Sequence, residues 1–228
     1  MSKIIFGIFA HPDDETFGLA GTLIKEVRAG ARLHLINLTA GEAGQNPDNL
    51  PNFAEVRLQE WRRAGDIIGA SSMHCLGFKD SQLDNRDMQT AQQKILDLTR
   101  EIIKNESSVE EVEFITMDLN GVTGHIDHIV AARAASFVFY KLRQQQNLPI
   151  TQIRYCCLPQ NRLPKVNTDW LYMEAGRPAN CINQTVEVRQ YQAEIIAAIE
   201  AHHSQRADAQ IHLKNLDSVL INHFIVAD

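Results

Sequence analysis

The first residues of the chain are apolar and rich in β-branched and aromatic side chains, from Ile4 to Ala10. A run of this kind predicts a strand that is buried on both faces of a parallel sheet. From Thr16 to Ala29, apolar residues recur at steps of three and four, and Gly30 stands where a helix would end. A strand followed by a helix begins a βαβ unit, so the N-terminal part predicts an α/β fold.

The alternation of strand and helix patterns continues along the chain. The further strands that we expect span residues 33–38, 73–76, 112–117, 153–158 and 184–188, with a short final piece at 219–226. The further helices that we expect span residues 53–68, 88–104, 127–144 and 190–203. This order predicts a Rossmann-like, doubly wound α/β fold, in which a mostly parallel sheet carries helices on both faces. We expect residues 1–228 to form a single domain.

Composition and charge exclude several classes of function. Twenty-two Lys and Arg residues stand against 28 Asp and Glu residues, and the formal charge of −6 offers no basic surface for nucleic acid. The four cysteines show no CxxC spacing and are expected to be reduced thiols. The apolar runs are too short for a signal peptide or a membrane span. We therefore expect a cytoplasmic protein without a nucleic-acid or membrane partner.

Polar and titratable residues follow the predicted strands at their carboxyl ends. Ligands bind at this edge of α/β sheets, so these side chains are the candidates for a functional site. They are His11, Asp13, Asp14 and Glu15 after the first strand, Thr39 and Glu42 after the second, Asp80 after the third, and Asn120, His125, Asp127 and His128 after the fourth.

Two of these segments have the spacing of metal ligands. His11 and Asp14 are three residues apart in a turn that Pro12 stiffens, and His125 and His128 are three apart at the start of a helix. Two histidines and one carboxylate would form an open three-ligand site that suits Zn²⁺ with a water in the fourth position, and Fe²⁺ uses the same ligands. Acidic residues also cap helices. Several ionisable groups at one sheet edge would nevertheless repel one another unless a cation lay between them.

Short motifs spread along the chain match one known family. They are Ala10-His-Pro-Asp-Asp-Glu15 with Gly18 and Gly21-Thr-Leu23, Leu38-Thr-Ala-Gly-Glu-Ala-Gly44, Arg57 with Glu60, Leu76-Gly-Phe-Lys-Asp80, Gly124-His-Ile-Asp-His128, and His203-Ser-Gln205. On these motifs the chain resembles the LmbE-like, or PIG-L-like, family of zinc-dependent N-acetylglucosamine deacetylases. The resemblance runs from the first strand to about Gln205.

The resemblance implies a role for each matching residue. Asp13 stands at the position of the general base that activates a zinc-bound water for attack on the acetamide. His125 stands at the position of the group that stabilises the oxyanion and can protonate the leaving amine, oriented by the carboxylate of Asp127. The chain has Ile126 where the family usually has proline, and this change removes no liganding atom. The family's zinc ligands stand at the positions of His11, Asp14 and His128.

Three further residues are assigned to substrate binding: Arg57, Glu42 and Asp80. The guanidinium of Arg57 could grip the sugar or an anionic group attached to it, and the alternative is an ion pair with Glu60 or Glu55. The substrate that the resemblance implies is a small amino-sugar molecule, from which the enzyme removes the N-acetyl group. Members of the family are often homo-oligomers, although no stripe of this sequence shows an interface.

Other interpretations remain at this point. An amidase of the same family, cleaving a larger acyl group from a thiol-sugar conjugate, would use every one of these catalytic residues. A non-haem iron oxygenase could combine His125 and Asp127 with His202, but it leaves the first motif unexplained. A magnesium-binding receiver-like module would have little use for His11 and His128. The roles of residues 154–188 and of His203, Ser204 and Gln205 stay open, and the weaker candidates there are Arg154, Tyr155, Arg162 and Tyr172.

Overall fold

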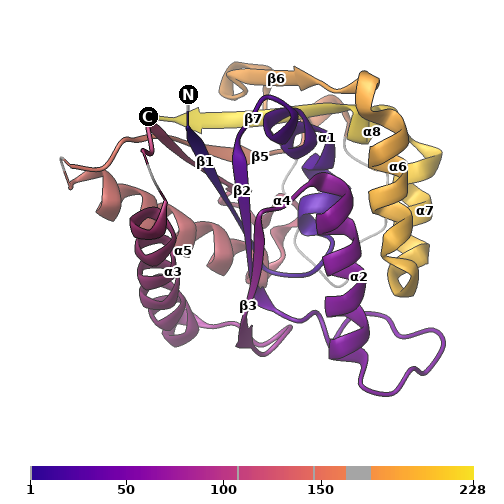
Figure 1. Cartoon of the computed structure of the whole chain (residues 1–228). Coiled ribbons are helices and arrows are strands. Elements are labelled where there is room, and N and C mark those ends of the chain that lie inside the picture. The colour runs from indigo at the N-terminus through magenta and orange to yellow at the C-terminus, as the bar shows by residue number, and fades with distance from the viewer. Residues whose placement is uncertain (1, 107, 146, 163–175) are drawn as a thin grey trace.

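The computed structural model describes residues 2–106, 108–145, 147–162 and 176–228, which form one seven-stranded sheet in the order β3-β2-β1-β4-β5-β7-β6 (Figure 1). Strands β1 to β5 pair in parallel, whereas β7 pairs antiparallel with both β5 and β6. The strands are β1 (Lys3–Phe9), β2 (Arg32–Thr39), β3 (Ser72–Phe78), β4 (Glu111–Met117), β5 (Ile150–Cys156), β6 (Gln184–Glu187) and β7 (Ile221–Ala227).

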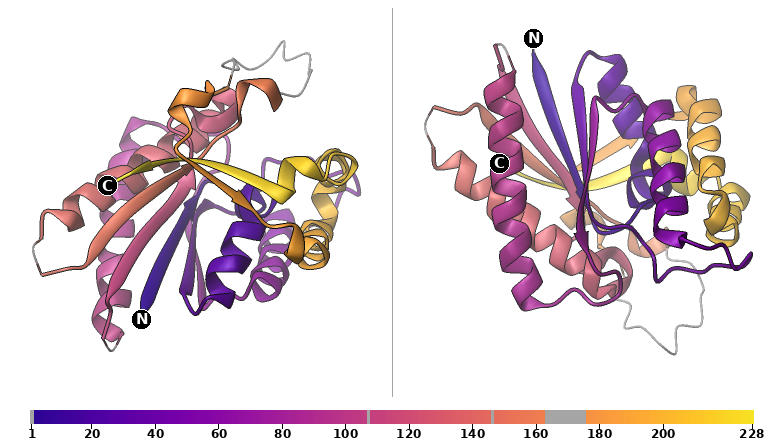
Figure 2. Two further views of the ribbon diagram at one scale, coloured as in Figure 1. Left: turned by 90° about the horizontal axis from the view of Figure 1, so that it is seen from above. Right: turned by 60° about the horizontal axis from the view of Figure 1, so that its bottom comes forward.

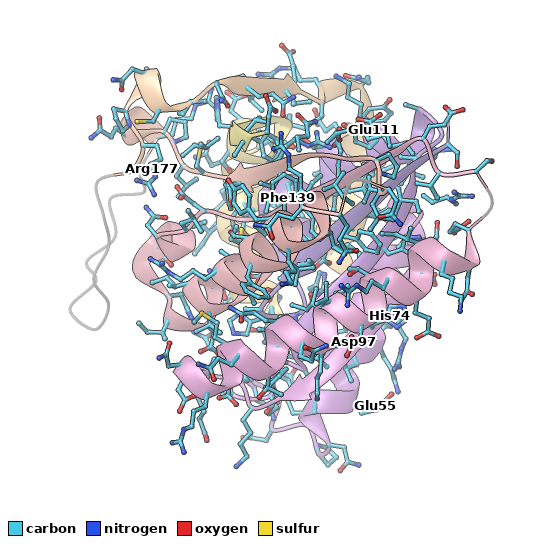
Figure 3. The ribbon with its side chains drawn as sticks, turned by 90° about the vertical axis from the view of Figure 1, so that its left-hand side faces the viewer. Glu55, His74, Asp97, Glu111, Phe139 and Arg177 are labelled. Carbon is cyan, nitrogen blue, oxygen red and sulfur yellow. The ribbon has the colours of Figure 1, made fainter. Side chains whose placement is uncertain are left out.

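Helices cover both faces of the sheet (Figure 2). Helices α3 and α5 pack on one face, which is viewed from their side in Figure 3, and α1, α2 and α6 pack on the other. The predicted fold class, a doubly wound and mostly parallel α/β sheet, is confirmed. The helices are α1 (Asp14–Arg28), α2 (Phe53–Ile68), α3 (Asn85–Asn105), α4 (Gly121–Gly124), α5 (Ile126–Arg143), α6 (Gln192–Ala201), α7 (Arg206–Lys214) and α8 (Asp217–Leu220).

The central strand β1 explains why its sequence is apolar throughout. Successive side chains of a strand point to opposite faces of the sheet. Ile4, Phe6 and Ile8 join the core under α3 and α5, whereas Ile5 and Phe9 join the core under α1, α2 and α6. All five side chains are fully buried. A strand that supplies both cores needs apolar residues at even and odd positions alike.

The C-terminal quarter differs from the sequence-based expectation. We expected one helix from residue 190 to 203, and the structure adds a second helix, α7, at residues 206–214. Only Ala209 of α7 is buried, so the helix presents no apolar stripe from which it could be predicted. The final piece of the chain forms β7, which lies between β5 and β6 in the sheet. Among the described helices, none is both long and apolar enough to cross a membrane.

The order of the strands creates a crevice at one edge of the sheet. β1 lies between β2 and β4, and the chain leaves β1 into α1 on one face but leaves β4 toward α5 on the other face. In open α/β sheets, ligands bind at such a switch point, outside the carboxyl ends of the strands. The two predicted metal-binding motifs follow β1 and β4 and therefore lie next to each other.

Arg154 has no place in this crevice, although the sequence made it a weak candidate for the substrate site. Its guanidinium is 1% exposed and pairs with Glu113 at 2.7 Å and with Glu26 at 2.9 Å. Burial would raise the pKa of Glu113, but Arg154 and Lys3 beside it hold that pKa below its usual value. Arg154 therefore neutralises buried carboxylates within the fold.

Candidate active site

The turn between β1 and α1 is held together by Asp14. Its Oδ2 accepts hydrogen bonds from the backbone N–H groups of Ala10 at 3.1 Å and of His11 at 3.0 Å. Its other oxygen, Oδ1, lies 3.1 Å from Nε2 of His128 at the start of α5. Between these residues, Asp13 has a φ of 111°, a backbone conformation that side-chain-bearing residues rarely adopt. Such strain is found where the surrounding structure holds a functional residue in place.

Three ligand atoms converge at the crevice: Nδ1 of His11, Nε2 of His128 and the carboxylate of Asp14. The two ring nitrogens lie 3.2 Å apart, and Asp14 lies 3.1 Å from His128 and 3.8 Å from His11. A tetrahedral zinc ion with bonds of about 2.0 Å separates its ligand atoms by roughly 3.3 Å. The spacing of the three atoms therefore fits such an ion.

The protonation of the two histidines supports the same ligand set. Nδ1 of His128 lies 3.1 Å from the carbonyl oxygen of Gly121, which can only accept, so Nδ1 carries the hydrogen. Nε2 of His11 lies 3.0 Å from Asp80 and 3.3 Å from Asp127, and donates to these carboxylates. The remaining ring nitrogens, Nδ1 of His11 and Nε2 of His128, face each other at 3.2 Å, and a cation between them would take the place of the proton that they share. Outer partners of this kind are typical of metal-binding histidines.

The charges around His11 also favour a cation. Burial disfavours its protonation, but the carboxylates of Asp127, Asp14 and Asp80 outweigh burial and raise the pKa of His11 well above its usual value. Burial alone would raise the pKa of Asp14, but His128 and His11 lower it well below its usual range. The site thus gathers negative charge that a metal ion would neutralise.

Asp13 stands beside the three ligand atoms and is held by Arg57. The guanidinium, which is 4% exposed, donates to Oδ2 of Asp13 at 2.6 Å and also to the carbonyl oxygens of Pro12 and Gly41. Burial raises the pKa of Asp13 to about 6, although Arg57 opposes the shift. A carboxylate whose pKa lies near neutrality is suited to proton transfer.

The contacts of Arg57 argue against one of the two earlier interpretations of it and leave the other untested. The surface ion pair with Glu55 or Glu60 is absent among the described residues: Arg62 pairs with Glu55, and Glu60 accepts hydrogen bonds from Ser204. The contact of Arg57 with a substrate stays a prediction, since the observed contacts of its terminal nitrogens are within the protein.

We expect Arg57→Lys to lower kcat by about 10- to 100-fold with little change in KM. A lysine ammonium cannot bridge Asp13 and two carbonyl oxygens in one plane, and small displacements of a catalytic group cost rates of this order. Steady-state kinetics checks this expectation, with Arg62→Lys as the exposed control on the same helix. A raised KM with normal kcat would instead assign Arg57 to substrate binding.

The ring of His125 lies beside the rings of His11 and His128 at the same site. Its ring stacks on His128 with centroids 4.7 Å apart, and its Nδ1 accepts the backbone N–H of Asp127 at 3.2 Å. Burial and the neighbouring His128 and His11 lower the pKa of His125 to about 4. The ring is therefore neutral near pH 7, with its hydrogen on Nε2, and can donate a hydrogen bond to a developing oxyanion.

The carboxylate of Asp127 has another partner than the one we expected. We expected the carboxylate of Asp127 to orient His125. Instead, its Oδ2 accepts a hydrogen bond from the backbone N–H of Ser81 at 2.7 Å and faces Nε2 of His11. The backbone of Asp127, not its side chain, contacts His125. A second set of close ligand atoms, on His11, His125 and Asp127, results from this arrangement.

Asp80 and Glu42 lie behind His11. Asp80 is buried, contacts His11 through Oδ1 and accepts the N–H of Ala43 through Oδ2 at 2.8 Å. Glu42 accepts the N–H of Asp80 at 3.1 Å and does not line the cavity at the site. Asp80 thus orients His11, Glu42 holds the backbone of Asp80, and the contact of either residue with a substrate stays a prediction.

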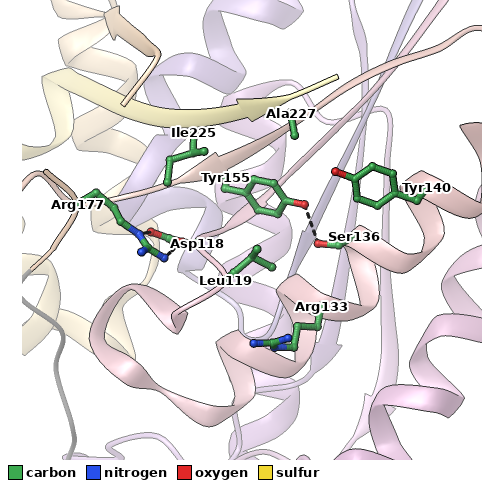
Figure 4. A pocket seen from close by; sticks show the side chains of 9 residues that line it. All are labelled: Asp118, Leu119, Arg133, Ser136, Tyr140, Tyr155, Arg177, Ile225 and Ala227. Carbon is green, nitrogen blue, oxygen red and sulfur yellow. Dashed lines mark hydrogen bonds and ion pairs between the residues drawn. The ribbon is translucent and has the colours of Figure 1, made fainter. Parts of the chain in front are cut away.

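One cavity of about 610 Å³ contains the site, a size typical of pockets for small molecules. Asp127 and Glu42 do not line it. A second cavity, of about 530 Å³, lies between α5 and the strands β5 and β7, and Tyr155, one of the weaker candidates from the sequence, lines it (Figure 4). The predicted site residues that line the first cavity are His11, Asp13, Asp14, Arg57, Asp80, His125 and His128.

The His203-Ser-Gln205 motif lies at the site cavity, which Gln205 lines. Glu60 accepts from the N–H and the hydroxyl of Ser204 at 2.9 and 2.6 Å, and Gln205 lines the cavity and donates to the carbonyl oxygen of Gln45 at 2.8 Å. Sequence reasoning did not single out Phe17 of α1 as a lining residue. Phe17 could have been predicted to line the cavity from its position in the first turn of the helix that follows the metal-binding motif. Tyr172 lies outside the described residues.

Two curated relatives cover much of the chain. Over 228 residues it is 25% identical to a 1D-myo-inositol 2-acetamido-2-deoxy-alpha-D-glucopyranoside deacetylase of Saccharopolyspora erythraea, which covers 87% of this chain and 82% of the relative. Over 160 residues it is 28% identical to a mycothiol S-conjugate amidase of Streptomyces coelicolor, which covers 64% of this chain and 54% of the relative.

Solved structures with the same fold include enzymes of two reaction types. The N,N'-diacetylchitobiose deacetylase of Pyrococcus horikoshii matches with a TM-score of 0.67 and 16% identity, over 99% of this chain and 84% of that one. The 4-carboxy-2-hydroxymuconate hydratase of Pseudomonas putida matches with a TM-score of 0.66 and 15% identity, over 100% and 97%. The shared fold alone does not decide the reaction.

The family is settled by a match to a family model. The model of the PIG-L family, described as GlcNAc-PI de-N-acetylase, matches residues 6–139, a stretch that contains both metal-binding motifs and more than half of the chain. This protein therefore belongs to the PIG-L family.

Proposed function

We propose that this protein is a metal-dependent hydrolase that removes the N-acetyl group from a small molecule containing N-acetylglucosamine. The observation that carries the proposal is the convergence of His11, Asp14 and His128 beside a strained, partly buried Asp13 in one cavity. Membership of the PIG-L family and the relatives named as deacetylases support it. Hydrolysis of a linear amide is the reaction that this group of residues serves.

Each residue has one task in the proposed reaction. A zinc ion, when bound by His11, Asp14 and His128, would polarise the amide carbonyl and make a water molecule more acidic. Asp13 takes the proton from the attacking water, a role for which its raised pKa suits it. Arg57 holds Asp13 in position.

His125 acts on the other side of the amide. Its neutral ring presents Nε2–H to the oxygen that becomes negative as the carbonyl is attacked. The leaving nitrogen needs a proton, and Asp13, which has just received one, is the group placed to supply it. Water thus delivers its hydroxyl to the acyl carbon and its proton to the amine, and the C–N bond breaks.

The ligand set argues for zinc and against the remaining rivals. An oxygenase site with His125, Asp127 and His202 is not assembled, because Nε2 of His202 faces the hydroxyl of Thr16 at 3.1 Å. A magnesium site prefers oxygen ligands, whereas two of the three converging atoms are histidine nitrogens. We propose zinc as the metal, and Fe²⁺ fits the same ligands.

We also propose a cytoplasmic location and a single domain over residues 1–228. The cysteines that the structure describes, Cys75, Cys156, Cys157 and Cys181, are free, which agrees with a reducing compartment. The net charge of −6 is unsuited to a nucleic-acid partner. A homo-oligomer stays an expectation from the resemblance.

Amine release from a panel of amides tests the proposed activity. We expect release from N-acetylglucosamine and its glycosides, and little from a thiol-sugar conjugate with a larger acyl group. Release from the conjugate alone would favour the amidase that shares these catalytic residues. No amine from any member of the panel, with metal bound, would overturn the proposed function.

A further inference from the structure

The cavity extends well beyond the metal ligands into an apolar arm. We use this name for the part lined by Phe17, Met117, Val122, Leu158, Ile211 and Ile221. These side chains come from α1, the end of β4, α4, the segment after β5, α7 and the start of β7. The arm is continuous with the site, so whatever fills it is joined to the group that reacts there.

Two apolar side chains of the arm are exposed to solvent, one of them largely and the other in part. Ile211 on α7 lines the cavity and is 60% exposed. Phe17, in the first turn of α1, is partly exposed and stacks on His212 with ring centroids 4.9 Å apart. Covering apolar surface of this kind removes it from water, which is favourable.

Two polar residues at this end of the cavity are engaged inside the protein, and His212 and His223 also line it. Asn222 donates to the carbonyl oxygens of Gly18 and Val219, each at 3.2 Å, and Ser218 donates to the carbonyl oxygen of Asn215 at 2.7 Å. The six apolar side chains of the arm offer no donor to the hydroxyl oxygens of a polyol, and burying a polyol against them would cost free energy. The charged lining residues beyond the metal end are Arg162 and Asp208, both exposed.

We propose that the substrate carries an apolar group, alkyl or aromatic, that fills this arm while its amide lies at the metal site. This inference rests on the proposed function and narrows its substrate class to amphiphilic derivatives of N-acetylglucosamine. The apolar group is the aglycone of the sugar, because the acyl group that the proposed reaction removes is acetyl.

Two glycosides of matched shape test the inference on the metal-loaded enzyme. Cyclohexyl N-acetylglucosaminide and N-acetylglucosaminyl-inositol have the same six-carbon ring and differ in its hydroxyl groups. We expect kcat/KM to be at least about tenfold higher for the cyclohexyl compound. Burial of each methylene group raises kcat/KM by about fourfold. N-hexanoylglucosamine is the third probe, and a tenfold advantage of it over N-acetylglucosamine would contradict the inference, because the apolar group would then lie on the acyl side.

A substitution in α7 links the preference to the arm. We expect Ile211→Asn to remove most of the advantage of the preferred apolar probe over its polar counterpart. Phe137→Ala is the matched control, because Phe137 is an apolar side chain, 45% exposed, on α5 outside the cavity. Circular dichroism verifies that both variants are folded.

The possible failures are distinguishable. If N-acetylglucosamine is hydrolysed but the cyclohexyl compound does not exceed its polar counterpart, the inference is wrong and the proposed function stands. An apolar preference that Ile211→Asn leaves intact also overturns the inference, because the group then lies outside the arm. If no probe releases amine, the proposed function itself fails.

Discussion

Replacing Asp13 by asparagine is expected to lower kcat by about 10²- to 10⁴-fold while the protein keeps its metal. General acid–base catalysis contributes rates of this order. Asparagine preserves the size of the side chain and is among the residues that tolerate a positive φ, such as the 111° found here. It cannot take the proton from water. The ligand atoms lie on His11, Asp14 and His128, so the metal content should not change.

The measurement is kcat together with the metal content of the same preparation. Glu55→Gln serves as the control, since Glu55 is an exposed carboxylate that pairs with Arg62 away from the cavity. Near-normal turnover of Asp13→Asn would show that another group accepts the proton. Loss of metal from this variant would mean that Asp13 is a ligand.

Replacing His128 by alanine is expected to abolish both metal binding and turnover. One of three protein ligands is then missing, and the loss of affinity should exceed the roughly 10- to 100-fold typical of removing an outer partner of a ligand. Replacing His125 by alanine should leave the metal in place and lower kcat, because the oxyanion loses its donor. Metal titration of the two variants gives the comparison.

This pair of variants also decides between the two sets of converging atoms. His11 belongs to both sets, whereas His128 belongs only to the set with Asp14, and His125 only to the set with Asp127. If His125→Ala loses the metal and His128→Ala retains it, the ion is held by His11, His125 and Asp127. The roles that we propose for His125 and His128 would then be exchanged.

Most of the sheet could be predicted from the sequence because its signals are local. The apolar run of β1 and the spaced apolar residues of α2 each reflect burial of their own side chains, and α2 spans residues 53–68 as expected. The position of β7 between β5 and β6 is a matter of long-range pairing, which no local pattern encodes. Helix α7 escaped prediction because only one small residue in it, Ala209, is buried.

The site was predictable to the extent that residue types and spacing define it. His11, Asp14 and His128 come together because they follow β1 and β4, neighbouring strands of a parallel sheet. The partners of Arg57 and the carboxylate of Asp127 could not be predicted, since they depend on how separate loops approach one another. Backbone groups such as the N–H of Ser81 and the carbonyl of Gly121 carry no sequence signal at all.

The most direct test of the central claim is amine release from N-acetylglucosamine before and after removal of the metal. The account predicts about one zinc or iron ion per purified chain by plasma mass spectrometry, activity that a chelator abolishes, and activity that returns when the metal is restored. Amine release that persists in fully metal-free protein would contradict it. So would a folded protein that binds no transition metal at this site.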